Sequence, residues 1–278
     1  MQKILVPTDF SPLASYATSA AIQIARKTGA EVILLHVVEM PGASFSVSGQ
    51  QIDSNEFDLY TLKLIAKTKE DLVKVVSAYE EDNVKLVSSL HIGNAYQAIA
   101  QVITEQKVDL VVMGSHGASG WEETFVGSNA EKVVRRSSCP VLVIKQKFDL
   151  SEIKSIIFAA DFNEDNHVID RVKATQEILG AKLHLVKINT PANFLSDHVS
   201  KETMTEFADI HQLHNYTINV YNDKQEENGI IYFADEVDAD LIALGTHGRT
   251  GLQHLLSGSI AEGVTNHSKR PVWTCKIT

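Results

Sequence analysis

The sequence has few of the residues on which disulfide-rich and membrane proteins depend. Its 278 residues include two cysteines, six prolines and 7% aromatic residues. Two cysteines cannot form a disulfide framework, so we interpret Cys139 and Cys275 as small buried apolar residues of a reducing compartment. Nowhere does the chain approach the roughly 18 consecutive apolar residues of a membrane-spanning helix. The first ten residues show no signal-peptide pattern, and we expect a cytoplasmic protein with no membrane partner.

Positive charge is also scarce. Lysine and arginine number 25 against 35 aspartates and glutamates, which gives a formal net charge of −10. An overall negative field repels phosphate backbones, so we expect no nucleic-acid partner. A local phosphate site remains compatible with this charge, because backbone amides bind phosphate without any basic side chain.

The chain repeats itself. Residues 3–10 resemble 155–162, residues 29–37 resemble 180–188, and residues 108–117 resemble 239–248. The second copy is shorter between its second and third matching segments. The extra residues of the first copy therefore fall after residue 37, and we place them in a loop within residues 41–60, which lack a clear period.

Each copy alternates short apolar runs with amphipathic stretches, a pattern that predicts strands and helices of a parallel sheet. For the first copy we predict strands at 4–6, 32–38, 85–90, 110–113 and 141–144, and helices at 12–28, 62–79, 95–104 and 129–136. We predict domains at residues 1–147 and 152–278. The short connection indicates that the repeats pack against each other, with strands 141–144 and 272–276 pairing or lying at that contact.

A glycine pattern follows one apolar strand in each copy. Gly114 and Gly117 precede Gly127 and Ser128, with nine residues between Gly117 and Gly127, and the second copy repeats this at Gly245, Gly248, Gly258 and Ser259. Glycine lets successive amides face one concavity, and the amides of a helix N-terminus stabilise phosphate. The two serines would either donate to phosphate or cap the helix, and both interpretations stay open.

Asp9 and Asp161 each follow the first strand of their copy. An aspartate there can accept hydrogen bonds from a ribose or a base edge, and the alternative is a cap at the start of the next helix. The rigid turn at Pro7 and Thr8 favours the binding interpretation for Asp9.

His116 and His247 lie inside the glycine loops, where we expect structural hydrogen bonds rather than catalysis, since no nucleophile accompanies them. The sequence contains no Walker A loop and no histidine or cysteine cluster with metal-ligand spacing. We therefore predict no metal site and no catalytic residue.

These segments resemble the universal stress protein (UspA-like) family in a tandem form. The resemblance covers nearly the whole chain, and residues 6–11, residues 34–37 and the two glycine patterns carry it. It implies two Rossmann-like (adenine nucleotide alpha hydrolase-like) α/β domains, each a five-stranded parallel sheet with helices on both faces. It also implies an adenine nucleotide as ligand: ATP, with or without Mg²⁺, or else ADP or AMP.

The resemblance further implies a set of binding residues. Asp9 and the backbone of Val37 would meet the base, and Met113 and Gly114 would lie near adenine and ribose. Phosphates would be held by Gly117, Gly127, Ser128 and Asn129. The corresponding residues of the second copy are Asp161, Ile188, Leu244, Gly245, Gly248, Gly258, Ser259 and Ile260. We add as candidates Pro7, Thr8, His116, His247 and Arg249.

Both copies depart from the family pattern. The first carries Glu122 and Glu123 within its glycine loop, and the second carries Arg249, which favours phosphate. The second also has two alanines, at 159–160, in place of Pro7 and Thr8. By alignment it has Lys224 in place of Gly93, so its base pocket differs from that of the first copy.

We expect an ATP-binding regulatory or stress-response module with at most slow hydrolysis. The alternative is a protein with two degenerate sites and a structural or partner-binding role. An enzyme is disfavoured, because phosphoryl transfer needs a metal carboxylate and a positioned nucleophile or water. The sequence leaves open which repeat binds nucleotide and whether the chain forms a homodimer.

Overall fold

The computed structural model describes residues 1–39, 54–115, 127–147, 149–162, 168–247 and 257–277. The first repeat contains β1 (Lys3–Pro7), α1 (Pro12–Thr28), β2 (Glu31–Val38), α2 (Ser54–Ser77), η1 (Glu80–Asp82), β3 (Leu86–Ile92), α3 (Ala95–Gln106), β4 (Leu110–Gly114), α4 (Ser128–Arg136) and β5 (Val141–Ile144). After the connecting turn η2 (Leu150–Glu152), the second repeat contains β6 (Ser155–Ala159), α5 (Val168–Leu179), β7 (Lys182–Asn189), α6 (Asp197–Ile210), β8 (Tyr216–Asn222), α7 (Glu226–Glu236), β9 (Leu241–His247), α8 (Ser257–His267) and β10 (Val272–Ile277).

Helix α1 begins and ends where the local sequence predicts. The Ala14 amide donates to Ser11 Oγ over 3.2 Å, and Pro12 occupies the first turn, where a missing amide hydrogen costs nothing. Gly29 ends the helix in the left-handed conformation, with φ at 72° and its amide bonded to Ala25 O. A residue with a side chain would be strained there.

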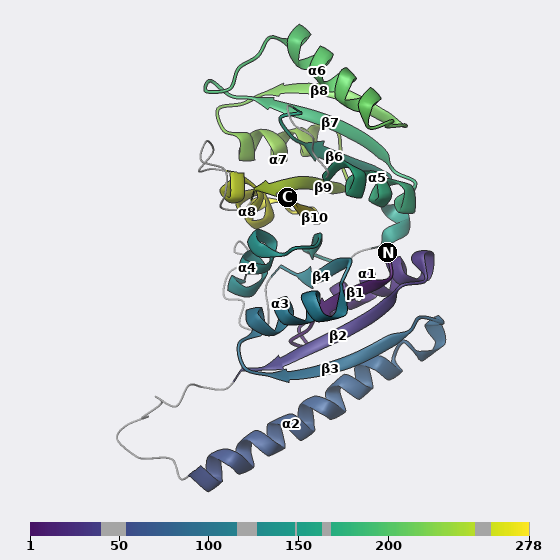
Figure 1. Ribbon diagram of the computed structural model, residues 1–278, viewed down its shortest axis with the longest axis vertical. Helices are drawn as coiled ribbons and strands as arrows, with labels where there is room; N and C mark the ends of the chain where they lie inside the picture. Colours follow the sequence, from purple (N-terminus) through teal and green to yellow (C-terminus); the bar gives the residue numbers. More distant parts are fainter. Residues whose placement is uncertain (40–53, 116–126, 148, 163–167, 248–256, 278) are drawn as a thin grey trace.

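All ten strands form one continuous sheet, in the order β3-β2-β1-β4-β5-β10-β9-β6-β7-β8 (Figure 1). Strands pair in parallel within each repeat, and β10 pairs antiparallel with β5 in the register Trp273↔Leu142. The predicted pairing of the two terminal strands is confirmed. The prediction did not foresee that this pairing fuses the two five-stranded units into one sheet. Because β5 and β10 run in opposite directions, the strands of the two repeats point in opposite directions. Their carboxyl ends therefore lie on opposite sides of the molecule.

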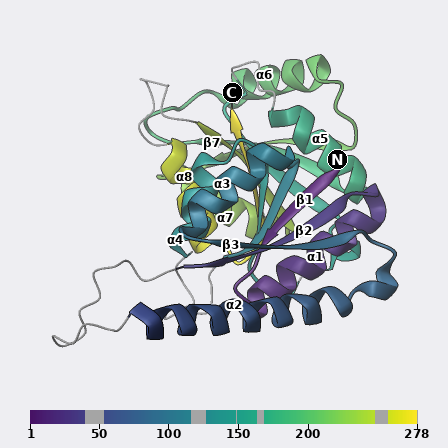
Figure 2. The ribbon, with the colours of Figure 1, turned by 60° about the horizontal axis from the view of Figure 1, so that its bottom comes forward.

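Helices cover both faces of the sheet, as expected (Figure 2). On one face, α1 and α2 of the first repeat and α5 and α6 of the second share a single apolar core. On the other face each repeat has a core of its own, under α3 and α4 or under α7 and α8. The shared core therefore joins the two repeats into one unit.

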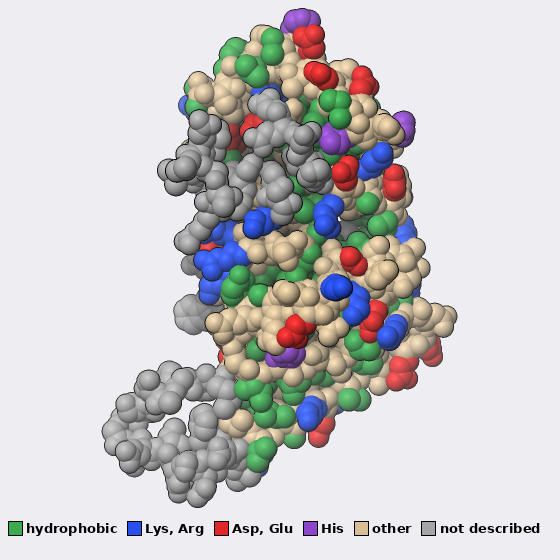
Figure 3. Space-filling view, in the orientation of Figure 1, with side chains coloured by type: hydrophobic (Ala, Val, Ile, Leu, Met, Phe, Trp, Pro, Cys, Tyr) green, Lys and Arg blue, Asp and Glu red, His purple; other side chains and the backbone are tan. Residues whose placement is uncertain are grey.

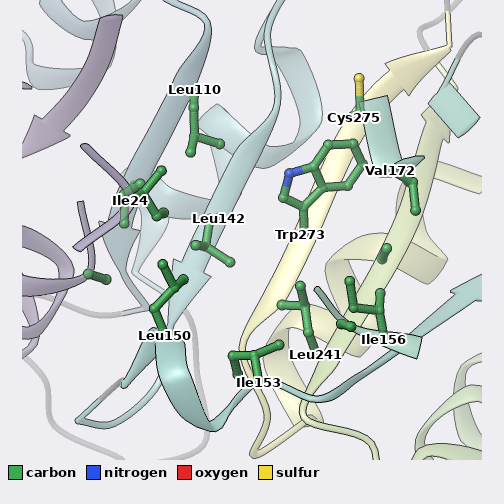
Figure 4. Close-up of a cluster of buried hydrophobic side chains, with 14 of the residues drawn as sticks. Ile24, Leu110, Leu142, Leu150, Ile153, Ile156, Val172, Leu241, Trp273 and Cys275 are labelled. Atoms are coloured by element: carbon green, nitrogen blue, oxygen red, sulfur yellow. The ribbon is translucent and has the colours of Figure 1, made fainter. Parts of the chain in front are cut away.

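The junction between the repeats is apolar (Figure 4). Leu150 and Ile153 of the connecting segment are buried, and the Leu150 amide donates to Gln23 Oε1 of α1 over 2.8 Å. Trp273 of β10 is 3% exposed and adjoins an apolar cavity of about 30 Å³ that is also lined by Leu142. The expected packing of the two repeats against each other is confirmed.

Three further expectations can be compared with the structure. Helix α2 begins at Ser54, so the end of the predicted 41–60 loop is helical, and residues 40–53 lie outside the described residues. Cys139 and Cys275 are free and buried, and burial raises the pKa of the Cys275 thiol to about 11. In the described part of the chain, every helix is too short or too polar to cross a bilayer.

Acidic and basic side chains are interspersed over the face shown in Figure 3.

Candidate nucleotide-binding crevices

Each repeat has a point where its strand order reverses. In the first repeat β1 lies between β2 and β4, so the connections that follow β1 and β4 leave toward opposite sides. Ligands of open α/β sheets bind in the crevice at the carboxyl ends of such strands. The corresponding pair in the second repeat is β6 and β9, whose carboxyl ends lie on the opposite side of the molecule.

A tight turn after β1 positions Asp9 at the first crevice. The Thr8 amide donates to Leu35 O over 2.8 Å, the Phe10 amide donates to Thr8 Oγ1 over 3.1 Å, and the Ser11 amide donates to Asp9 Oδ1 over 3.0 Å. Ser11, rather than Asp9, caps α1. The helix-cap alternative for Asp9 is therefore wrong, and its exposed carboxylate forms part of the turn instead.

Phe10 and His36 support this turn, and sequence reasoning did not single out either as part of the site. Phe10 adopts a left-handed φ of 64°, which is unusual for a bulky residue. His36 Nδ1 donates to Thr8 O over 2.8 Å, and its ring stacks on Phe10 with centroids 4.7 Å apart. The His36 proton is thus committed to holding the turn.

Gly114 and residues of the core lie at the strand ends beside the candidate first crevice. A Cβ on Gly114 would lie 2.9 Å from Leu13 Cβ, so this glycine lets α1 approach the end of β4. Met113 is 6% exposed and belongs to the core under α3 and α4, against which half-buried Val37 packs. Met113 can therefore offer a ligand its backbone rather than its side chain.

The candidate phosphate position of the first crevice is the start of α4. The Gly127 amide donates to Ser115 O over 2.7 Å, which ties the helix N-terminus to the end of β4. Gly127 is the N-cap and has no side chain with which to cap the first-turn amides. Ser128 and Asn129 are the first helical residues, so Ser128 is not the N-cap. The candidates His116 and Gly117 lie outside the described residues.

The second repeat keeps the turn but changes the side chains beneath it. Phe162 has φ at 61°, as Phe10 has, yet it is 5% exposed and packs edge-on against Phe158 and Phe207. Lys187 occupies the strand position of His36. It is 3% exposed, and its Nζ lies 3.7 Å from Asp161 Oδ1.

The candidate base position of the second crevice is also more closely packed. Ile188, the counterpart of Val37, is 6% exposed, and a Cβ on Gly229 of α7 would lie 2.6 Å from Ile188 Cγ2. Thr190 and Asn193 follow β7, and the Thr190 amide and hydroxyl both donate to Asn193 Oδ1. Hydrogen bonds within the chain thus order the segment after β7.

The counterpart of Gly93 is Asp223, not Lys224 as the alignment predicted. The Asp223 amide donates to Asn189 O over 3.0 Å, just as the Gly93 amide donates to Val38 O over 3.0 Å. The second repeat has one more residue between this bond and the following helix, so ungapped alignment shifted the match. Gly93 has a φ of 128°, whereas Asp223 is not among the residues with positive φ.

The other candidates of the second crevice are only partly described. Leu244 is 3% exposed, Gly245 lies within β9, and His247 is its last residue. The helix α8 begins at Ser257, so Gly258 and Ser259 lie in its first turn, followed by half-buried Ile260. Gly248 and Arg249 lie outside the described residues.

Comparison with known proteins identifies the family. The model of the universal stress protein family matches residues 1–145 and again residues 152–276. The chain belongs to the universal stress protein family. Universal stress protein MJ0531 of Methanocaldococcus jannaschii is 34% identical over 146 residues, covering 52% of this chain and 82% of that protein.

Two other relatives match the tandem chain throughout. Universal stress protein Slr1230 of Synechocystis is 24% identical and covers 99% of both chains. The crystal structure of a universal stress protein from Archaeoglobus fulgidus superposes with a TM-score of 0.76 at 20% identity, covering 99% of this chain and 98% of that one. The tandem architecture is therefore shared with full-length members of the family.

Charged side chains connect the two universal stress protein repeats where α4 meets α8. Arg135 NH1 lies 3.3 Å from Glu262 Oε2 and 3.8 Å from Glu131 Oε1. Burial and the neighbouring Glu131 raise the pKa of Glu262. Lys145, just after β5, donates to Asn266 O of α8 over 3.4 Å, and burial lowers its pKa to about 8.

Proposed function

We propose that this universal stress protein binds an adenine nucleotide, ATP in the first instance, in the crevice between β1 and β4. The observation that carries the proposal is the hydrogen bond from Gly127 to Ser115. It places the N-terminus of α4, without a capping side chain, beside the strand end next to the Asp9 turn. First-turn amides and the positive end of the helix dipole stabilise phosphate. The family resemblance of the glycine pattern supports the same ligand.

The two ends of the crevice suit the two ends of a nucleotide. Asp9 presents a carboxylate that can accept hydrogen bonds from the exocyclic amine or the ribose hydroxyls. The amides of Ser128 and Asn129 would hold phosphates, and a Mg²⁺ ion would enter with them rather than in a preformed metal site. ADP and AMP share the base and ribose, and they would bind less tightly in proportion to the phosphate contacts they lose.

We further propose that the nucleotide serves as a signal rather than as a substrate for rapid turnover. His36 Nδ1 donates to the Thr8 carbonyl, and this bond holds the ring within the turn. Phosphoryl transfer depends on a metal carboxylate and a positioned water. Slow hydrolysis is the most activity we expect, and the role is regulation through changed contacts with a partner.

The test is equilibrium binding of a fluorescent ATP analogue to the purified chain and to its Gly127→Asp variant. Aspartate is a good N-cap residue and fits the φ of −61° and ψ of 146° at this position, so the fold should be kept. Its carboxylate would compete for the first-turn amides, and we expect affinity to fall by at least about tenfold. Gly127→Ala is the uncharged control and should bind nearly as well as the native chain.

Absence of binding at millimolar nucleotide would refute the proposal. Undiminished binding by both Gly127→Asp and the equivalent Gly258→Asp variant would refute it as well. That second result would place the ligand away from either helix N-terminus and favour a structural role for both crevices.

A further inference from the structure

We infer that the chain binds one adenine nucleotide, in the first repeat only, because Asp161 of the second repeat serves as the counter-ion of buried Lys187. This inference rests on the proposed function and assigns it to one of two crevices. It also gives Asp161 a structural role at the position where the first repeat places its base-binding carboxylate.

Lys187 of β7 is a buried lysine. Its side chain is 4% exposed, and Nζ lies 3.7 Å from Asp161 Oδ1, whose own side chain is 63% exposed. A buried ammonium without a partner is strongly destabilising. Among the described residues, Asp161 is the carboxylate that compensates it. Asp161 is therefore required by the fold, whatever the second crevice binds.

The corresponding position of the first repeat has different chemistry. His36 stands where Lys187 stands, and it donates to the backbone oxygen of Thr8 rather than to a carboxylate. The Asp9 carboxylate accepts from the Ser11 amide in its own turn and is exposed. The first repeat therefore fixes the turn through a contact with the backbone.

The aromatic residues of the two turns also differ in burial. Phe10 is 37% exposed at the first crevice, whereas Phe162 is 5% exposed and fixed by the rings of Phe158 and Phe207. Phe162 belongs to the apolar core under α5 and α6. The second turn is thus part of the core.

The opposite wall of the second crevice is also closely packed. Ile188 packs under Gly229 so closely that an added methyl group would overlap it. Asn193 Nδ2 donates to Glu226 Oε1 over 2.7 Å, and Asn189 Nδ2 donates to Leu195 O over 2.9 Å. These bonds draw the segment after β7 against α7, at the place where a base would need to meet the backbone of Ile188.

The first experiment compares Asp9→Asn with Asp161→Asn, two matched substitutions that each remove one charge. Isothermal titration with ATP measures affinity and stoichiometry, and thermal unfolding measures stability. We expect one nucleotide per native chain. Asp9→Asn should weaken binding at least about tenfold and leave the melting temperature nearly unchanged. Asp161→Asn should lower the melting temperature by roughly 10 °C and leave the affinity within about twofold.

The second experiment keeps the inference testable if Asp161→Asn fails to fold. Lys187→Met removes the buried charge and keeps the volume of the side chain, so Asp161→Asn should cost little stability in that background. A double-mutant cycle on thermal unfolding measures this coupling. Additive effects of the two substitutions would overturn the counter-ion role.

Stoichiometry separates this inference from the proposed function. Two nucleotides per chain, or an Asp161→Asn variant that folds but binds ATP at least about tenfold more weakly, would overturn the inference and leave the proposed function standing. No bound nucleotide would overturn the proposed function, and the assignment of one crevice with it. The double-mutant cycle would still decide whether Asp161 compensates Lys187.

Discussion

The two repeats share a backbone and differ in what lies beneath it. In both, an aromatic residue follows the first-strand aspartate with φ near 60°, at 64° for Phe10 and 61° for Phe162. In the first repeat that ring stacks on His36 near the surface, and in the second it is buried against Phe158 and Phe207. The same turn therefore lies at the surface in the first repeat and within the core in the second.

A second pair of equivalent positions shows the same divergence. In the first repeat Arg136 of α4 lies over the ring of Tyr96 of α3, at 5.8 Å from its centroid. In the second repeat His267 Nδ1 lies 2.5 Å from Glu227 Oε1. One repeat joins its two helices by a cation–π contact and the other by a hydrogen-bonded acid–base pair. Helix packing is thus kept while its chemistry changes.

The largest expected effect comes from the close helix approach in the first repeat. Gly114→Val would place a Cβ 2.9 Å from Leu13 Cβ and 3.1 Å from its carbonyl carbon. Backbone cannot yield easily, so we expect a loss of about 3 kcal/mol in the free energy of unfolding, measured by denaturant titration. The control is Gly263→Ala, where the atoms nearest the added Cβ belong to the Glu227 carboxylate, so the cost is that of displacing the end of a side chain from His267 rather than moving backbone. An equal cost for both would contradict this reasoning.

Gly229→Ala tests whether the second crevice is closed. Alanine normally favours a helix over glycine by about 1 kcal/mol. Here its methyl would overlap Ile188, and we expect a net destabilisation of about 1–2 kcal/mol in thermal unfolding. The equivalent residue of the first repeat is already an alanine, Ala98. A stabilised Gly229→Ala variant would show that the second base position has room, which would weaken the contrast between the repeats.

Lys145→Met tests the junction between the repeats. The folded pKa of Lys145, about 8, lies below the ordinary 10.5, so burial disfavours its charged form. We expect the variant to be more stable at pH 7 by about 1–2 kcal/mol, after allowing for the lost hydrogen bond to Asn266.

The stability difference between Lys145→Met and the native chain should depend on pH. The penalty on the native chain is complete below pH 8 and shrinks as the pH rises toward 10.5, so the gap between Lys145→Met and the native chain should narrow by pH 10. Exposed Lys147→Met is the control and should show no such gap. A destabilised Lys145→Met variant at pH 7 would mean that its hydrogen bond outweighs the cost of burial.

The smallest expected effect concerns the carboxylates between α4 and α8. The raised folded pKa of Glu262 means that the folded chain holds this proton more tightly than the unfolded chain does. The resulting stabilisation is present at low pH and is lost as the pH rises through the folded pKa. Glu262→Gln should therefore change stability at pH 7 by no more than about 0.5 kcal/mol, since the lost ion pair with Arg135 offsets the relief. Thermal unfolding at pH 7 and pH 4 checks this, and a loss well above that size would show that the ion pair dominates.

Much of the fold could be predicted from the sequence because the relevant signals are local. Ser11, Pro12 and Gly29 marked the ends of α1, and the apolar runs marked the strands. The roles of Lys187 and Phe162 could not be predicted, because alternation along a strand gives the face of a residue but not the partner that covers it. Asp223 could not be recognised as the counterpart of Gly93, because the alignment of the two repeats is shifted by one residue there. The hydrogen bond from the Asp223 amide to Asn189 O reveals the shift.

The most direct measurement is a crystal structure of the chain grown with saturating ATP. The account predicts nucleotide density in the first repeat alone, with the base beside Asp9 and the phosphates on the amides of Ser128 and Asn129. It also predicts that Lys187 stays paired with Asp161. Density for a base at Asp161, or an empty first crevice beside an occupied second one, would contradict it.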